Sequence, residues 1–310
     1  MAAGRRTDAG GSGARPELLA DLGLLLIAAV WGTSFALQKT ALPQIGAAWF
    51  NTLRFAVASA VLVPLFLPAL RRATRRQLAT GTAVGLILGA AMLLQSAGLV
   101  GTTASVGGFI SGLPVVITPI LAIPLLGERP RPWTAVSVLL AIIGLALISL
   151  TDSVAIGRGD LLVLASSVGF ALQIVLTGAF ARGTDPRVLG TMQSVGALAV
   201  CAVAAVSFDR LPASLSPGVG AIILQQGTIN LGLVWVLQSW AQQHASATRT
   251  ALVYTMEPVF ALAFAWWWLG ETLTPRAAAG ALAILVAMIV ASVGPLLRRS
   301  LRPDRGRIPA

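Results

Sequence analysis

The stretch Ser246–Glu271, SATRTALVYTMEPVFALAFAWWWLGE, decides the fold class. It is long enough to cross a bilayer, because a membrane-spanning helix needs about 20 mostly apolar residues. Near its middle, Glu257 is followed directly by Pro258. A carboxylate at membrane depth is costly, and the proline removes a backbone donor at the same point. A charge beside an interrupted hydrogen-bond ladder is suited to a polar site inside a membrane. The rest of the chain is then expected to form the scaffold of that site.

The composition of the whole chain indicates a helical membrane protein. The 310 residues are 56% hydrophobic and only 11% charged, whereas a soluble domain carries about 25% charged residues. The lone cysteine, Cys201, lies in an apolar run, so we predict no disulfide framework and no thiolate metal site. The net charge of +11 would suggest nucleic acid in a soluble protein. Here the arginines lie at the ends of apolar segments, so we predict a lipid bilayer as the environment and no nucleic-acid partner.

Apolar runs between polar breaks predict ten membrane-spanning helices. Their predicted bounds are Leu18–Gln38, Gly46–Leu67, Leu78–Leu99, Thr103–Leu126, Trp133–Leu150, Asp160–Ala181, Val188–Phe208, Gly218–Trp240, Ser246–Leu269 and Pro275–Leu297. The Gly/Ala/Arg-rich residues 1–17 are predicted to be disordered, and residues 298–310 form a basic tail.

The distribution of cationic residues predicts the orientation. With the N-terminus inside, the inner segments hold sixteen of the 22 Lys and Arg residues and the outer segments hold four. The remaining two, Arg54 and Arg249, fall within spans. This excess of inner positive charge predicts that both termini are cytoplasmic, which requires an even number of spans.

The chain repeats itself. Leu94-Gln95-Ser96 recurs as Leu237-Gln238-Ser239, and Leu126-Gly127-Glu128 recurs as Leu269-Gly270-Glu271, each 143 residues further on. The predicted units are residues 18–150 and 160–297, with five spans each. Because five is odd, the two units must have opposite orientations in the membrane. Inverted repeats are typical of transporters, in which two similar halves exchange conformations around a central site. The alternative is a duplication kept only for stability.

Several short motifs, in order and doubled, resemble one family. They are Val30-Trp31-Gly32-Thr33-Ser34-Phe35, Leu53-Arg54-Phe55, Thr102–Ser105 with Leu126-Gly127-Glu128-Arg129-Pro130, and Ala245-Ser246-Ala247 with Met256-Glu257-Pro258-Val259 and Leu269-Gly270-Glu271. This pattern over residues 18–297 resembles the EamA family of the drug/metabolite transporter superfamily. The resemblance implies a ten-helix inverted-repeat carrier of the inner membrane, usually an exporter of small metabolites such as amino acids.

The two halves depart from each other in chemistry. Leu113-Pro114 stands where the second half has Glu257-Pro258, so the proline is duplicated and the acid is not. Gln193 stands where the first half has Arg54. A symmetric site is therefore not expected, and Glu257 is more plausibly connected with substrate or coupling than with bending.

Glu257 and Arg54 are the foremost candidates for chemistry. Glu257 can bind a substrate ammonium group, couple transport to protons or pair with Arg54; alternatively it is a neutral or paired residue that stabilises the kink at Pro258. Arg54 can bind a substrate carboxylate or pair with Glu257; alternatively it bonds helix-end carbonyl groups or extends to the interface. Arg249 lies near the cytoplasmic end of its helix, where snorkelling is the favoured interpretation.

Five further residues are candidates for lining the site. Trp31 precedes small polar residues and can form a pocket wall, or it packs as an ordinary core residue. Gln95 and Gln238 recur in the repeat and either face the cavity or bond across helices. Tyr254 lies one turn before Pro258, and Asn230 belongs to an unusually polar helix that must face protein or water.

These residues favour a secondary carrier over two other classes. A membrane-embedded enzyme would need an acid/base or nucleophile set, and the sequence has one His, one Cys and no HExxH-type spacing. No phosphate-binding glycine loop is present, so we predict no cofactor, no metal site and no ATP-driven transport. A proton or substrate gradient is the expected driver, with a small molecule as substrate and a monomer or homodimer as the assembly. A passive channel is the second alternative.

Overall fold

The computed structural model describes residues 14–102, 104–128, 132–149, 157–210, 212, 214–269 and 274–300. Within these ranges the chain forms helices and no strand. The helices before residue 150 are α1 Ala14–Gly32, α2 Ser34–Ile45, α3 Ala47–Leu65, α4 Leu67–Arg72, α5 Arg75–Val100, α6 Ala104–Ser111, α7 Pro114–Leu126 and α8 Pro132–Ser149. The later ones are α9 Arg158–Ala181, α10 Pro186–Phe208, α11 Pro217–Gln225, the π-helical segment η1 Gln226–Gly232, α12 Val234–Ala241, α13 Ala247–Tyr254, α14 Glu257–Leu269 and α15 Pro275–Ser300.

The structure confirms an all-helical membrane protein. Seven stretches of the described residues are long and apolar enough to span a bilayer: Ala47–Leu65, Arg75–Val100, Gly107–Leu126, Pro132–Ser149, Arg158–Ala181, Pro186–Phe208 and Pro217–Ala241. The first and ninth predicted spans are divided into α1/α2 and α13/α14, and the tenth is a shorter apolar helix over Pro275–Ala291. The number of ten spans therefore stays a prediction.

Two predicted spans, the fourth and the ninth, are interrupted at equivalent places in the two repeats. α6 ends at Ser111 just before Pro114, and α13 ends at Tyr254 just before Pro258. A proline offers no N–H group to the preceding turn, so the hydrogen-bond ladder cannot run through these points. The Leu252 carbonyl, in the turn before the second break, accepts from the Thr255 amide at 3.1 Å and from the Thr255 hydroxyl at 2.6 Å. The duplicated proline therefore produces a duplicated break.

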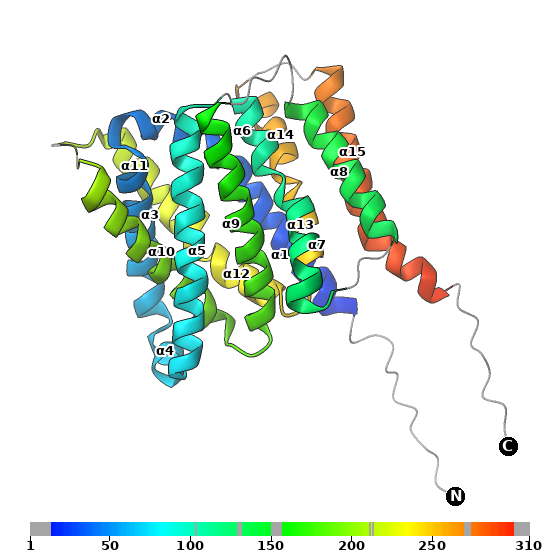
Figure 1. Cartoon of the computed structure of the whole chain (residues 1–310), viewed down its shortest axis with the longest axis horizontal. Helices are drawn as coiled ribbons and strands as arrows, with labels where there is room; N and C mark the ends of the chain where they lie inside the picture. Colours follow the sequence, from blue (N-terminus) through cyan, green and yellow to red (C-terminus); the bar gives the residue numbers. More distant parts are fainter. Residues whose placement is uncertain are drawn as a thin grey trace, which may run out of the picture.

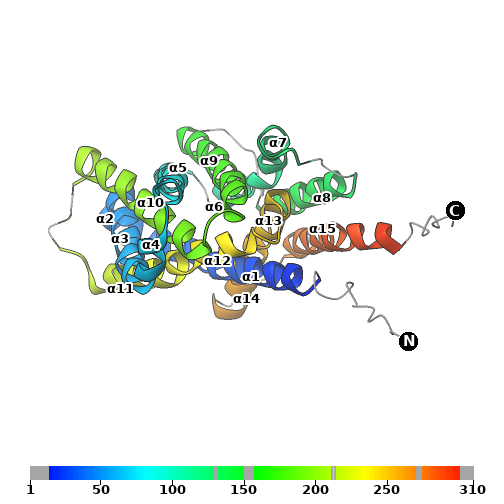
Figure 2. The same ribbon diagram turned by 90° about the horizontal axis from the view of Figure 1, so that it is seen from below.

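The most extensive helix contacts join one repeat to the other. α5 lies between α9 and α10, and α8 packs along α15 at one edge of the bundle (Figures 1 and 2). Close approach requires glycine at Gly85, where an added Cβ would lie 2.3 Å from the Gln193 carbonyl oxygen. Membrane helices commonly use small residues in this way. The two repeats therefore share one core.

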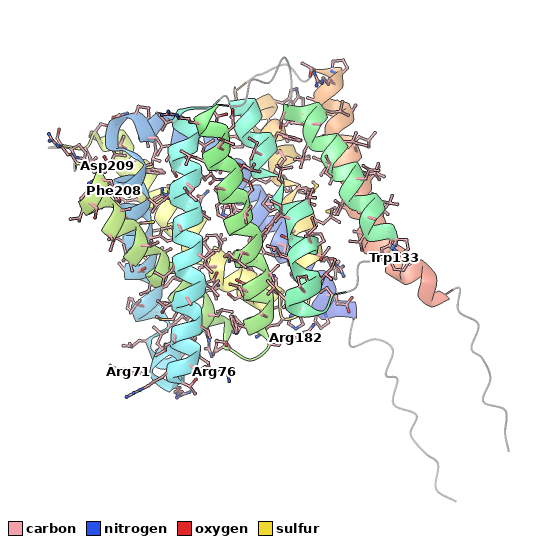
Figure 3. The ribbon with its side chains drawn as sticks, viewed as in Figure 1. Arg71, Arg76, Trp133, Arg182, Phe208 and Asp209 are labelled. Atoms are coloured by element: carbon pink, nitrogen blue, oxygen red, sulfur yellow. The ribbon has the colours of Figure 1, made fainter. Side chains whose placement is uncertain are left out.

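The bundle has one strongly basic end. Arg71, Arg76 and Arg182 lie together at this end, and Phe208 and Asp209 lie at the other (Figure 3). We call the first the arginine end. α1 begins at Ala14 rather than at the predicted Leu18, and α15 continues to Ser300. The rest of the two predicted tails, residues 1–13 and 301–310, lies outside the described residues.

Candidate functional site

Three aromatic rings meet where α1 ends. The ring centroid of Trp31 is 5.4 Å from that of Trp235 on α12 and 5.0 Å from that of Tyr254 at the end of α13. The ring planes are tilted by 49° and 58°, within the range that aromatic pairs favour. Trp235 is buried, whereas Trp31 and Tyr254 are partly exposed. The fold thus brings together Trp31 and Tyr254, which lie far apart in the sequence. We call Trp31, Trp235 and Tyr254 the aromatic cluster.

Asn230 ties the aromatic cluster to the π-helical segment. Trp31 Nε1 donates to the Asn230 carbonyl oxygen at 3.1 Å, and Asn230 Nδ2 donates to the Val30 carbonyl oxygen at 3.1 Å. Gln225 Nε2 donates to Asn230 Oδ1 at 2.9 Å. A π-helix holds more residues per turn than an α-helix, and such segments are frequent at functional sites. Polar residues of the predicted span Gly218–Trp240 therefore contact the rest of the protein, as the sequence predicted for Asn230.

Glu257 lies beside this cluster, in the first turn of α14. Its neighbour is Gly32, where an added Cβ would lie 3.0 Å from the Glu257 carbonyl oxygen and 2.9 Å from the Ala261 amide nitrogen. The described residues offer the Glu257 carboxylate neither a hydrogen-bond partner nor an ion-pair partner. The positive end of the α14 helix dipole favours negative charge at this position. The carboxylate is therefore available to an incoming group.

Arg54 lies in a separate polar cluster between α3 and η1. Its side chain is 1% exposed. Nη1 donates to Gln226 Oε1 at 3.3 Å, Nη2 donates to Asn51 Oδ1, and the guanidinium lies 4.4 Å from the centre of the Phe50 ring. No ion pair joins Arg54 to Glu257 in the described structure. Arg54 and Glu257 therefore do not pair with each other. The Arg54 side chain is buried and does not extend to the interface.

Gln95 and Gln238 occupy different surroundings despite their equivalent places in the repeat. Gln95 Nε2 donates to Ser111 Oγ at 3.3 Å, beside the break that ends α6. Gln238 Nε2 donates to Gln173 Oε1 at 3.3 Å and to Gln242 Oε1 at 3.0 Å. Both therefore bond to other residues of the bundle, and the structure does not bring either of them into the aromatic cluster.

Charged residues fix α13 at the arginine end. Arg249 donates to Asp21 on α1 and lies 3.8 Å from Glu17. Glu128, just beyond α7, accepts from the Ala247 amide at 3.1 Å and from the Thr248 hydroxyl at 2.7 Å. Arg249, for which snorkelling was the favoured interpretation, thus forms ion pairs with two acids of α1. We call Glu17, Asp21, Glu128 and Arg249 the charged anchor.

Some of these contacts escaped sequence reasoning. Trp235 carries no signal of its own, because a tryptophan in an apolar span is ordinary. Asp21 offered a signal, since it is an acid within the first predicted span and matches Asp160 in the repeat. The described residues contain no group of His, Cys, Asp and Glu side chains arranged to hold a metal ion. A groove of about 920 Å³ near Arg182 and Trp240 is lined by none of the predicted site residues.

The helices, their apolar surfaces and the two matching breaks define a multi-pass membrane protein built from two repeats. The chain belongs to the EamA-like transporter family, which matches residues 18–150 and 157–293. These ranges overlap the two predicted repeats, and the family gives the protein its broad class, a transporter.

Two relatives agree with this assignment, and one solved structure shares the fold. An uncharacterized transporter of Archaeoglobus fulgidus is 31% identical over 92% of this chain and 89% of its own length. The uncharacterized transporter YyaM of Bacillus subtilis is 28% identical over 84% of this chain and 89% of its own. A crystal structure of another protein shares the fold, with a TM-score of 0.75 and 18% identity over 92% of this chain and 99% of that one.

Proposed function

We propose that the protein is a secondary carrier that exports small metabolites, such as amino acids and related compounds or drugs, by alternating access. In this proposal ten helices cross the inner membrane as two inverted repeats, with both termini cytoplasmic. The driver is a proton or substrate gradient, and the assembly is a monomer or homodimer. The gathering of arginines at one end of the bundle supports this orientation.

The paired breaks carry the proposal. Each leaves a half-helix of eight residues, α6 in one repeat and α13 in the other. A half-helix joined to its partner by a break can tilt without bending a continuous hydrogen-bond ladder. If the repeats are inverted, the two half-helices lie at opposite faces of the membrane, as two alternating gates require.

The proposed substrate site is the aromatic cluster with Asn230 and Glu257. The rings supply an apolar wall, and the Glu257 carboxylate is the ionisable group beside it without a partner in the described structure. This arrangement suits a substrate with an apolar part and a cationic or protonated group. Glu257 either binds that group directly or exchanges a proton with it during the cycle.

Replacing Glu257 tests this site. We expect Glu257→Gln to fold and to lose transport or its dependence on the proton gradient, because glutamine keeps the shape and removes the charge. The substrate is first found by a thermal-shift screen of amino acids, drugs and metabolites on purified protein, since a ligand stabilises the native state that binds it. Uptake is then measured in proteoliposomes, with Asp209→Asn as the matched control at the end of α10. Normal transport with unchanged pH dependence in Glu257→Gln would exclude a coupling role.

A counterflow assay separates a carrier from a channel. In a carrier, substrate on the far side accelerates entry of labelled substrate, because the loaded site returns faster than the empty one. A passive channel shows no such acceleration. An embedded enzyme is disfavoured because the matching family is one of transporters.

A further inference from the structure

The positive charge of Arg54 has no negative partner in the described structure. The ion pairs there are formed by Arg187 and Arg249, not by Arg54. The partners of the Arg54 guanidinium are neutral: Asn51, Gln226, the Phe50 ring and the Met92 sulfur at 4.0 Å. The Cys201 thiol donates to the Gly89 carbonyl at 3.7 Å and forms no ion pair with Arg54. The interior therefore holds a cation that only neutral dipoles solvate.

In the second repeat, the residue equivalent to Arg54 is uncharged and its side chain is hydrogen-bonded. Gln193 stands there in place of Arg54, and its Oε1 accepts from Gln173 Nε2 at 2.6 Å and from Thr177 Oγ1 at 3.4 Å. Its Nε2 donates to Ser239 Oγ at 3.2 Å. This neutral set gives both the oxygen and the nitrogen of the Gln193 amide a partner. The architecture of the repeat therefore does not need an arginine at this place, and the charge in the first repeat calls for another explanation.

Two buried donors near Arg54 remain open. Arg54 Nε and Gln226 Nε2 have no hydrogen-bond partner, although both side chains are at most 1% exposed. Gln226 Oε1, by contrast, is occupied by Ser34 Oγ at 2.8 Å as well as by Arg54. Open donors around an uncompensated cation match a ligand that is negative and accepts hydrogen bonds. Gln38 Oε1 is also open and can accept from a hydroxyl group of such a ligand.

We infer that Arg54 and Gln226 form a buried site for a compact monoanion, held at the junction of α3 and η1. The anion is either the carboxylate of the transported substrate or a chloride ion, since both present a single negative charge to the same donors. The first source rests on the proposed carrier function, and the second does not. Arg54 is enclosed, so the ligand enters when η1 moves away from α3. Gly227 permits their close approach, because an added Cβ there would lie 2.6 Å from Val57 Cβ and 2.8 Å from the Arg54 carbonyl oxygen.

The test measures the thermal stability of purified protein as sodium chloride or sodium acetate is added to a low-salt zwitterionic buffer. We expect a saturable rise in the melting temperature of the wild type with at least one of the two anions. Arg54→Gln, which copies the arrangement around Gln193, should lose that rise. Arg54→Lys should keep it at higher anion concentrations, because it retains the charge without the planar donor set. Arg158→Gln, which removes an exposed arginine at the start of α9, should behave as the wild type.

The outcomes separate the two sources and do not depend on transport. Saturation with acetate alone assigns the site to a substrate carboxylate, and saturation with chloride, alone or with acetate, assigns it to an exchangeable inorganic anion. If the melting temperature does not rise, or rises equally in wild type and Arg54→Gln, the inference is overturned. Should Arg54→Gln fail to fold, wild-type crystals grown with bromide and with bromoacetate decide the matter. An anomalous peak beside Arg54 with either probe supports the site, and its absence with both refutes it.

Discussion

Arg54 and Glu257 are both ionisable residues deep in predicted spans, and the fold keeps them apart. Each lacks an opposite charge in the described structure. Moving a single ion from water into a protein interior costs several kcal/mol even after relaxation, so folding alone does not explain two ionisable residues at membrane depth without an opposite charge. We therefore regard them as two separate points of contact for ligands and not as one structural pair.

A second prediction for a single residue concerns Asp185 and the stability of the folded protein, and it does not depend on transport. Its carboxylate accepts from the Arg187 amide at 2.9 Å and so caps α10. The hydrogen bonds from the Arg187 side chain hold the pKa of Asp185 below its ordinary value. The ionised group therefore stabilises the folded protein above that value, and the contribution is lost as the pH falls through the lowered pKa.

Two substitutions separate the cap from the charge. We expect Asp185→Asn to keep the cap and to lose only the part of the stability that varies with pH. Asp185→Ala should cost a further 1 kcal/mol, approximately, because it also removes the cap. Melting temperatures measured between about pH 6 and pH 3 check both expectations. If the two variants have the same melting temperature at pH 6, the cap does not stabilise α10.

At the scale of helices, close packing makes Gly85 more sensitive to substitution than Gly218. An alanine there would place its Cβ 2.3 Å from the Gln193 carbonyl oxygen, so α5 and α10 would have to separate. Overpacking of this kind costs about 1–3 kcal/mol. Gly218, in the first turn of α11, has no atom within 4 Å of an added Cβ.

We therefore expect Gly85→Ala to lower the melting temperature in detergent and Gly218→Ala to leave it unchanged or slightly higher. An equal response of the two variants would mean that the α5–α10 contact contributes little to stability.

Most helices were predictable from the sequence, whereas their interruptions were only partly so. Long apolar runs located α3, α5, α8, α9 and α10 within a few residues, because bilayer thickness fixes helix length. Pro114 and Pro258 indicated loosened helices. The break at Thr33 and the π-helical segment were not predicted, since they depend on contacts between repeats, such as that of Gly32 with α14. In the candidate site, the predicted residues Trp31, Tyr254 and Asn230 lie together. Trp235 and the partners of Arg54 could be identified only from the structure.

At the scale of the whole molecule, the charged anchor joins a half-helix of the second repeat to the first. If α13 is a gate at the arginine end, the contacts of Arg249 and Glu128 must break when that end opens. Holding them together should therefore stop the transport cycle without removing the substrate site.

We expect Asp21→Cys combined with Arg249→Cys to transport until the two thiols are joined by a reversible crosslinker, and to regain transport when a reducing agent releases it. Uptake into proteoliposomes is the measurement, and the two single-cysteine variants are the controls. Undiminished transport in the crosslinked protein would show that α13 does not need to leave α1.

The sharing of one core between the repeats also has a consequence for biosynthesis. The ribosome makes α5 well before α10, and at about 5–20 residues per second several seconds separate the two. During that interval the close-packed face of α5 around Gly85 meets lipid or a chaperone instead of its partner. A chain that stops before α10 is therefore an incompletely packed membrane protein and not a smaller folded one, and cellular quality control should remove it.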